Sequence, residues 1–298
     1  MKVLQVALGQ QFDIRDAFAG VSDVVYWDWS GRNRTFNSDL RVLVENHNPD
    51  LVFLQIQTPG VIGVDTARYI AGKCKVVNWT GDVRHPLPQW FIDIGKVIHM
   101  TLFTNMTDVE TARARGIRAD YLQIGFPEKI FKPEGEVREE AEIVFMGNNH
   151  GGFPLSGLRY QMVDALQRKY GKRFKVFGGN WKGFHAENNQ EEEAKIYRGA
   201  KIAINLSHFN YSRYSSDRLF RLIGTGVFCL SHNYKDIALE FEAGKHLDVW
   251  NDIPDLLNKI DYWLQYDIER KHIAKQGCEH VHTNHLWRNR IKQLMEMI

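Results

Sequence analysis

Two arginines, Arg218 and Arg221, stand three residues apart in the segment Ser215-Ser216-Asp217-Arg218-Leu219-Phe220-Arg221. On a helix, both guanidinium groups would share one face near its N-terminus, and Ser215 or Ser216 would cap it. This arrangement suits a diphosphate, because the helix dipole and the planar fork of arginine both stabilise anionic oxygens. Two solvated arginines paired with Asp217 or with a neighbouring domain are the alternative, and composition alone leaves the two interpretations even.

A glycine-rich turn, Gly147-Asn148-Asn149-His150-Gly151-Gly152, follows an apolar run at 142–147 and precedes a helical pattern at 156–170. Turns at the C-terminal edge of an α/β sheet bind phosphates through backbone N–H groups. Small and amide residues gather here beside a histidine, which favours a ligand site over an ordinary turn. The strand predicted at 201–206 likewise has a polar residue, Asn205, near its C-terminal end.

Asp82 and His85 follow a predicted strand at 75–79, at the ligand edge of the first half of the chain. Either group is a candidate general base that would accept a proton from an attacking hydroxyl. A turn capped by Asp82 and followed by prolines is an equally good interpretation.

The sequence lacks the motifs that are typical of several enzyme classes. The sequence contains no G-x-x-x-x-G-K-[ST], no G-x-G-x-x-G after a strand, no G-x-S-x-G, no H-E-x-x-H and no D-x-D. P-loop hydrolysis and a D-x-D metal clamp are therefore disfavoured, and we predict no metal site. His280, His282 and His285 have no accompanying cysteine or carboxylate cluster, so a surface or interdomain helix start is the better interpretation there.

The elements that must position these residues alternate along the chain. Strand-like runs occur at 2–8, 23–27, 51–56, 75–79, 99–104 and 119–124, with helical stretches near 38–47, 64–72, 88–95 and 107–116. After a segment at 125–136 that is rich in proline, glycine and charge, strands are predicted at 142–147, 173–178, 201–206, 227–231 and 246–249. Helices are predicted at 156–170, 190–199 and 216–224, after the strand at 227–231 through 241, and over most of 252–298. This pattern predicts an α/β fold with two doubly wound domains and a hinge between them.

Composition sets the outer limits. The 298 residues are 44% hydrophobic with a formal charge of +2, which allows two globular domains and demands no nucleic-acid partner. No run approaches the ~20 apolar residues of a membrane span, so no membrane insertion is expected. Three cysteines without a C-x-x-C, and no signal-peptide pattern, favour a cytoplasmic protein.

Six short motifs in the second half then carry a resemblance. They are Phe177-Gly178-Gly179-Asn180-Trp181, Arg218-Leu219-Phe220-Arg221 with its following Gly226-Val227-Phe228, Phe241-Glu242-Ala243-Gly244-Lys245, Asp252-Ile253-Pro254-Asp255-Leu256, Glu269-Arg270 with Ile273-Ala274 and Gly277, and His285-Leu286-Trp287 with Arg290. In this order they resemble the CgeB-like (spore maturation protein type) glycosyltransferases over about residues 180–290. The first half is similar only through Pro49-Asp50-Leu51-Val52 and Trp79-Thr80-Gly81-Asp82.

The resemblance implies a GT-B glycosyltransferase, with two Rossmann-like domains facing each other across a cleft. Residues 1–130 would form the acceptor domain, 138–284 the nucleotide-sugar domain, and 285–298 a terminal helix that packs back on the first. The family implies a metal-independent transfer from a nucleoside-diphosphate sugar, UDP- or GDP-linked, with no further cofactor. Donor-binding residues would be Gly147, Asn148, Asn149, His150, Gly179, Asn205, Ser216, Asp217, Arg218, Phe220 and Arg221, while Asp82, His85, Arg218 and Arg221 would be catalytic.

This sequence departs from the family pattern at one site. Arg221 stands where the family often has a glutamate, and Arg213 stands where related enzymes have a second carboxylate. The residues that contact the ribose of the donor nucleotide, and the identity of the donor, therefore stay open. The acceptor also stays open: it could be a glycan, a protein, a small molecule or, less favoured, modified DNA. The sequence leaves the stereochemistry of the transfer and the oligomeric state open as well.

Two other functions are compatible with the sequence. One is a non-catalytic nucleotide- or sugar-binding protein with a hinge. The other is a glycosyltransferase for modified DNA bases, with Arg32, Arg34, Arg113, Arg115, Arg118 and the 288–292 cluster along the DNA backbone. Scattered arginines on a nearly neutral chain are more often solvated surface groups.

Overall fold

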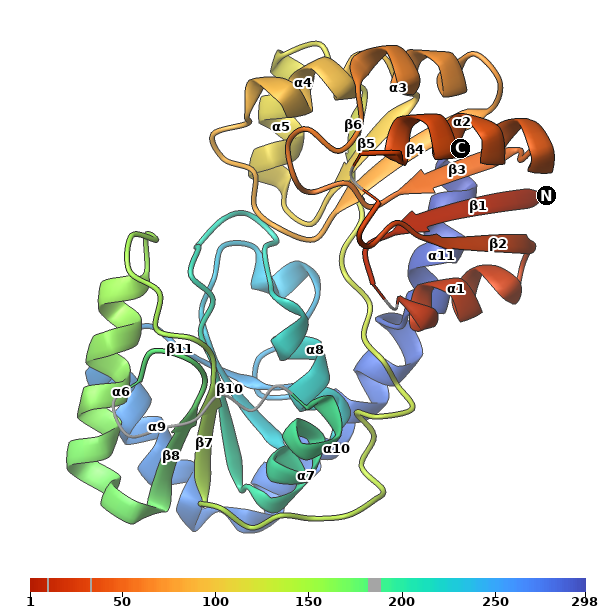
Figure 1. Ribbon diagram of the computed structural model, residues 1–298. Helices are drawn as coiled ribbons and strands as arrows, with labels where there is room; N and C mark the ends of the chain where they lie inside the picture. Colours follow the sequence, from red (N-terminus) through yellow and green to blue (C-terminus); the bar gives the residue numbers. More distant parts are fainter. Residues whose placement is uncertain (10, 33, 182–188) are drawn as a thin grey trace. The chain divides into compact units, whose positions relative to one another are not determined.

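Each half of the chain folds around a fully parallel sheet, as the computed structural model shows for residues 1–9, 11–32, 34–181 and 189–298 (Figure 1). One unit consists of Met1–Ile124 together with Trp287–Ile298, and the other consists of Gly125–Leu286. The predicted α/β class is confirmed, because strands and helices alternate in both units.

The sheet of the first unit has the strand order β2-β1-β3-β4-β5-β6. Its strands are β1 (Lys2–Ala7), β2 (Asp23–Asp28), β3 (Leu51–Leu54), β4 (Lys75–Thr80), β5 (Met100–Phe103) and β6 (Ala119–Tyr121). The connecting helices are α1 (Phe12–Ala19), α2 (Phe36–His47), α3 (Val64–Ala71), α4 (Gln89–Gly95) and α5 (Met106–Ala114).

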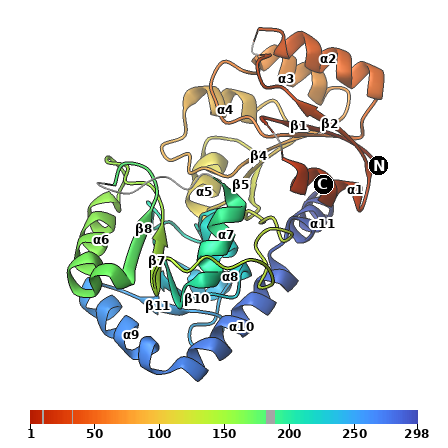
Figure 2. The same cartoon turned by 60° about the horizontal axis from the view of Figure 1, so that its bottom comes forward.

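Both faces of this sheet are covered, which explains why its strands are apolar at nearly every position. Alternate side chains of a strand point to opposite faces, so Leu4 packs with α2 and α3 whereas Val3 packs with α1. The terminal helix α11 (Trp287–Met297) lies beside α1 on this second face (Figures 1 and 2). The Trp287 ring meets Trp79 edge-on, at 5.1 Å between ring centroids.

The sheet of the second unit has the order β11-β10-β9-β7-β8. Its strands are β7 (Ile143–Met146), β8 (Phe174–Phe177), β9 (Ile202–Asn205), β10 (Phe228–His232) and β11 (Asp248–Trp250). Helices α6 (Ser156–Tyr170) and α9 (Ile253–Gln265) pack on one face, while α7 (Gln190–Gly199) and α8 (Asp217–Gly224) lie on the other (Figure 2). The long helix α10 (Asp267–Asn284) packs against α8.

Two elements differ from the sequence-based expectation. Helix α1 was not predicted, although Ile14, Ala17 and Phe18 have the helical spacing of its buried face. The helix predicted through 241 is wrong, since β10 extends to His232 and only a single 3₁₀ turn, Ile237–Leu239, follows. The helices were also compared with the requirements of a membrane span. Within the described ranges, no helix is both long enough and apolar enough to cross a bilayer.

Candidate functional site

The turn after β7 and the loop after β9 lie at the point where the strand order of the second sheet reverses. Strand β7 pairs with β8 on one side and with β9 on the other, so the connections leaving β7 and β9 diverge to opposite faces. Open α/β sheets bind ligands at this position, outside the carboxyl ends of the strands. The predicted turn at Gly147 and the predicted Asn205 therefore belong to one site.

Backbone and side-chain hydrogen bonds fix the turn after β7 against the turn after β8. Asn149 N donates to Gly179 O (2.9 Å), and Asn148 Oδ1 accepts from Gly179 N (2.7 Å). The Trp181 indole donates to Gly147 O (2.6 Å). Gly178, at φ +139°, approaches so closely that a Cβ there would lie 2.4 Å from Gly147 O. These contacts explain the glycine and tryptophan positions of the 177–181 motif.

Arg218 projects from the first turn of α8 to this turn. Its Nη2 donates to Leu206 O (2.8 Å) and its Nε to Asn205 Oδ1 (3.4 Å). A Cβ on Gly147 would lie 2.9 Å from Arg218 Nη1, so the missing side chain makes room for the guanidinium. Asn205, which also donates to Ser231 Oγ (3.0 Å), is thus a buried residue that positions Arg218.

A second arginine, which was not among the predicted site residues, joins this cluster. Arg159 on α6 is only 2% exposed and donates to Asn148 O (2.9 Å) and Leu206 O. Its guanidinium and that of Arg218 each lie 5.4 Å from the centroid of the Phe145 ring. Burial and the Arg218 charge lower the pKa of Arg159 to about 8.

A signal for Arg159 was present in the sequence. Arg159 is followed by Met162, Val163 and Leu166, so it occupies the first position of the buried stripe of α6. An arginine in such a stripe indicates a buried cation that needs acceptors, and here backbone carbonyls at the ligand edge supply them.

Arg221 has different surroundings from Arg218. Its guanidinium forms ion pairs with Asp217 on its own helix (2.6 Å) and with Glu193 on α7 (3.5 Å). Desolvation raises the pKa of the Glu193 carboxyl, whose side chain is only 12% exposed. The positive charge of Arg221 is therefore compensated within the protein, and Asp217 is occupied by this pair.

The start of α8 keeps its first N–H groups free of a side-chain cap. Ser216 is the N-cap residue, but its hydroxyl makes no capping hydrogen bond, and Ser215 Oγ bonds to Ser216 O instead. Ser216 Oγ is shielded from solvent and has no hydrogen-bond partner in the described part of the chain. The predicted serine cap is therefore not formed, and the helix N-terminus stays available to an anion.

The predicted donor residue Phe220 lies in the hydrophobic core instead. Its fully buried ring stacks on His285 at 5.0 Å between centroids, and Phe241 stacks on the same histidine at 5.3 Å. These three residues come from three of the motifs that carry the family resemblance. That part of the resemblance therefore reflects core packing.

The remaining predicted donor residues line the turn. His150 lies 5.9 Å from His208 between ring centroids, and its carbonyl accepts from Ser156 Oγ (2.6 Å). Asn149 donates from its amide to Asn180 O (3.3 Å).

In the first unit, Asp82 is an exposed carboxylate after β4. Its side chain is 74% exposed and lies 3.4 Å from Arg84, which also donates to Gln57 Oε1 (2.7 Å). Asp108, missed in the sequence, holds this loop by accepting from Arg84 N (2.6 Å), and burial raises the pKa of its carboxyl. His85 lies close enough for its charge to act on Asp108.

The three C-terminal histidines contact their own unit. His280 bonds through Nε2 to Glu240 O (2.8 Å), and His282 bonds to Gly224 O (2.9 Å). Among the described residues, no group of three histidine, cysteine or acidic side chains is arranged to hold a metal ion.

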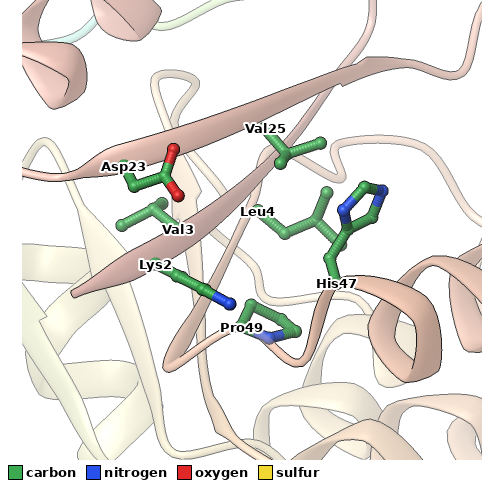
Figure 3. Close-up of a pocket in the computed structure, with 7 residues that line it drawn as sticks. All are labelled: Lys2, Val3, Leu4, Asp23, Val25, His47 and Pro49. Atoms are coloured by element: carbon green, nitrogen blue, oxygen red, sulfur yellow. The ribbon is translucent and has the colours of Figure 1, made fainter.

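A pocket in the first unit lies at the wrong edge of its sheet for a ligand site of this fold. Lys2, Asp23, His47 and Pro49 surround about 80 Å³ of space at the beginnings of β1 and β2 (Figure 3). Ligands of open α/β sheets bind at the carboxyl ends of the strands, and small-molecule pockets are several times larger.

Comparisons with known proteins give one family match and several similar folds. Residues 159–296 match the family model described as glycosyl transferase-like. A glycosyltransferase from Rickettsia africae ESF-5 superposes with a TM-score of 0.69 at 11% identity, covering 99% of this chain and 97% of the other. The Anabaena protein Alr3699/HepE, in complex with UDP and glucose, superposes with a TM-score of 0.70 at 10% identity, covering 100% and 99%.

The chain has the GT-B fold of these structures, and its residues 159–296 are similar to the glycosyl transferase-like family. Another similar structure is the DNA-modifying enzyme β-glucosyltransferase, solved in the presence and absence of uridine diphosphoglucose (TM-score 0.64, 13% identity, 99% and 100% covered). Comparison of this chain with curated protein sequences gives no match. The family match covers α6 to α11 and therefore contains both Arg159 and Arg218.

Proposed function

We propose that this chain is a glycosyltransferase, which transfers a sugar from a UDP-sugar, bound at the turn after β7, to an acceptor hydroxyl without a bound metal. The observation that carries the proposal is the convergence of Arg159 and Arg218 beside Gly147. Neither guanidinium has a carboxylate partner in the described part of the chain. UDP is the nucleotide bound by Alr3699/HepE, which supports a uridine donor here. The CgeB-like subtype remains part of this proposal.

The leaving nucleoside diphosphate gains negative charge as the bond to the sugar breaks. Arg218 would donate to its oxygens, and the uncapped N-terminus of α8 and the N–H groups of the turn would add fixed dipoles. Because these groups are held in place before the donor binds, little reorganisation is needed during the reaction. The positive charges of Arg159 and Arg218 would thus stabilise the leaving diphosphate, as a divalent ion does in other enzymes.

On the acceptor side we propose Asp82 as the general base of an inverting transfer. Its carboxylate is exposed at the carboxyl end of β4, whereas the nearby Asp108 is buried and holds the loop. A base must reach the attacking hydroxyl, so the accessible carboxylate is the better candidate. His85 would contribute to the electrostatic environment of this loop.

Modified DNA is the less favoured acceptor. Two of the arginines considered for a DNA track form ion pairs, Arg32 with Asp39 (3.8 Å) and Arg113 with Asp120 (3.3 Å). Arginines paired in this way offer less net charge to a phosphate backbone.

Release of nucleotide from UDP- and GDP-sugars, measured in EDTA, tests the proposal. The purified chain should hydrolyse a UDP-sugar slowly, and Arg218→Ala should lower the rate by about 10²–10³-fold. Arg168→Ala, which removes an exposed arginine of α6 (side chain 78% exposed), is the matched control and should leave the rate unchanged. Donor binding without any turnover would favour the non-catalytic alternative, and loss of activity in EDTA would contradict metal independence.

A further inference from the structure

His208 occupies an unusual position beside the two arginines. Its Nε2 lies 2.8 Å from Arg159 Nη1. Because a guanidinium only donates hydrogen bonds, this Nε2 must accept, and the imidazole is neutral with its proton on Nδ1. Nδ1 is shielded from solvent and has no hydrogen-bond partner among the described residues. His208 therefore has a proton-accepting nitrogen aimed at a cation.

The charged and titratable groups that face His208 are cationic or neutral. They are Arg159 on α6, Arg218 on α8 and His150 in the turn after β7, while Tyr214, in the loop before α8, acts on Arg159. No carboxylate within the described ranges acts on His208 or forms an ion pair with either arginine. Desolvation and the two arginine charges lower the pKa of His208 to about 4.

A bound diphosphate would favour the protonated form of His208. Its negative charge next to Arg218 would offset the repulsion that keeps a proton off the imidazole. Arg159 Nη1 already donates to Asn148 O at 2.9 Å, so it would retain an acceptor when Nε2 of His208 becomes a donor. The protonated ring would then add a third hydrogen-bonding cation to the diphosphate site.

We propose that His208 is a further donor-binding residue, and that Nε2 takes up one proton from solvent when the diphosphate of the donor binds. Arg159 is the positioning residue that holds the ring in the empty site. This inference rests on the proposed function, because it requires a nucleotide-sugar in the turn after β7. It predicts a donor affinity that increases as the pH falls.

Calorimetric titration with UDP-glucose tests the inference. Each phosphorus of this probe has one ester bond and one anhydride bond and carries no group with a pKa near neutrality, so any proton taken up belongs to the protein. Measured at pH 5.5 in buffers of different ionisation enthalpy, uptake should be about 0.9 proton per bound donor if the pKa returns to its ordinary value near 6.5. Affinity should be about eightfold higher at pH 5.5 than at pH 7, where Arg159 is still mostly protonated.

His208→Gln should abolish both effects, whereas His272→Gln, on the exposed surface of α10, should retain them. The unmodified chain offers a second readout, since one histidine ring resonance should titrate near pH 4 without donor and near its ordinary value with it. Binding without proton uptake, or uptake that persists in His208→Gln, would overturn this inference and leave the proposed function intact. Absence of UDP-glucose binding at both pH values would overturn the proposed function and the inference together.

Discussion

At the scale of single residues, Arg218 and Arg221 differ in whether their guanidinium groups are already ion-paired within the protein. Only an arginine without such a pair can offer its full charge to the donor diphosphate. Both stand on α8, three residues apart, and both were predicted to bind the diphosphate. Arg221 is neutralised by Asp217 and by Glu193, a residue of α7. The spacing on α8 could be predicted from the sequence, but the partner from another helix could not, because it depends on how α7 packs.

Asp82 provides a residue-scale prediction. Asp82→Asn should lower the transfer rate by about 10²–10⁴-fold, since an amide cannot accept the proton of the acceptor. The affinity for UDP should be unchanged, because the proposed diphosphate contacts come from Arg218 and the turn after β7. Asp65→Asn removes another exposed carboxylate of the first unit and is the matched control. Equal transfer rates in the two variants would exclude Asp82 as the base.

At the scale of elements, several motif residues pack helices against loops. Phe220 on α8, Phe241 before the loop to β11, and His285 at the end of α10 form one stack. Gly277 lets α10 approach this loop, as a Cβ there would lie 2.0 Å from His246 O. These positions could be recognised from the sequence as a pattern, but their packing role was not evident from spacing alone.

Phe220→Ala separates the packing role from a donor contact. Removing this buried ring should destabilise the protein by about 3–5 kcal/mol, as measured by urea unfolding. Phe220→Leu, which retains most of the volume, should cost less and should bind UDP as the unmodified chain does. A loss of UDP affinity in Phe220→Leu with unchanged stability would instead indicate contact with the donor.

At the scale of the whole molecule, the two parallel sheets could be predicted because buried strands such as Leu51–Leu54 are apolar throughout. The order of strands could not be, since it depends on crossover connections that leave no local pattern. Knowing that order places Gly147 and Leu206 side by side at the switch point of the second sheet. Arg159 joins them from α6, which explains why only part of the site could be predicted from the sequence.

A crystal structure of the chain with bound UDP would show whether Arg218 binds the donor. We expect diphosphate oxygens at about 2.7–3.2 Å from the Arg218 guanidinium, next to the turn that begins at Gly147. Arg221 should keep its ion pairs with Asp217 and Glu193 in the complex. UDP bound without contact to Arg218, for example at the opposite edge of either sheet, would contradict the proposed donor site.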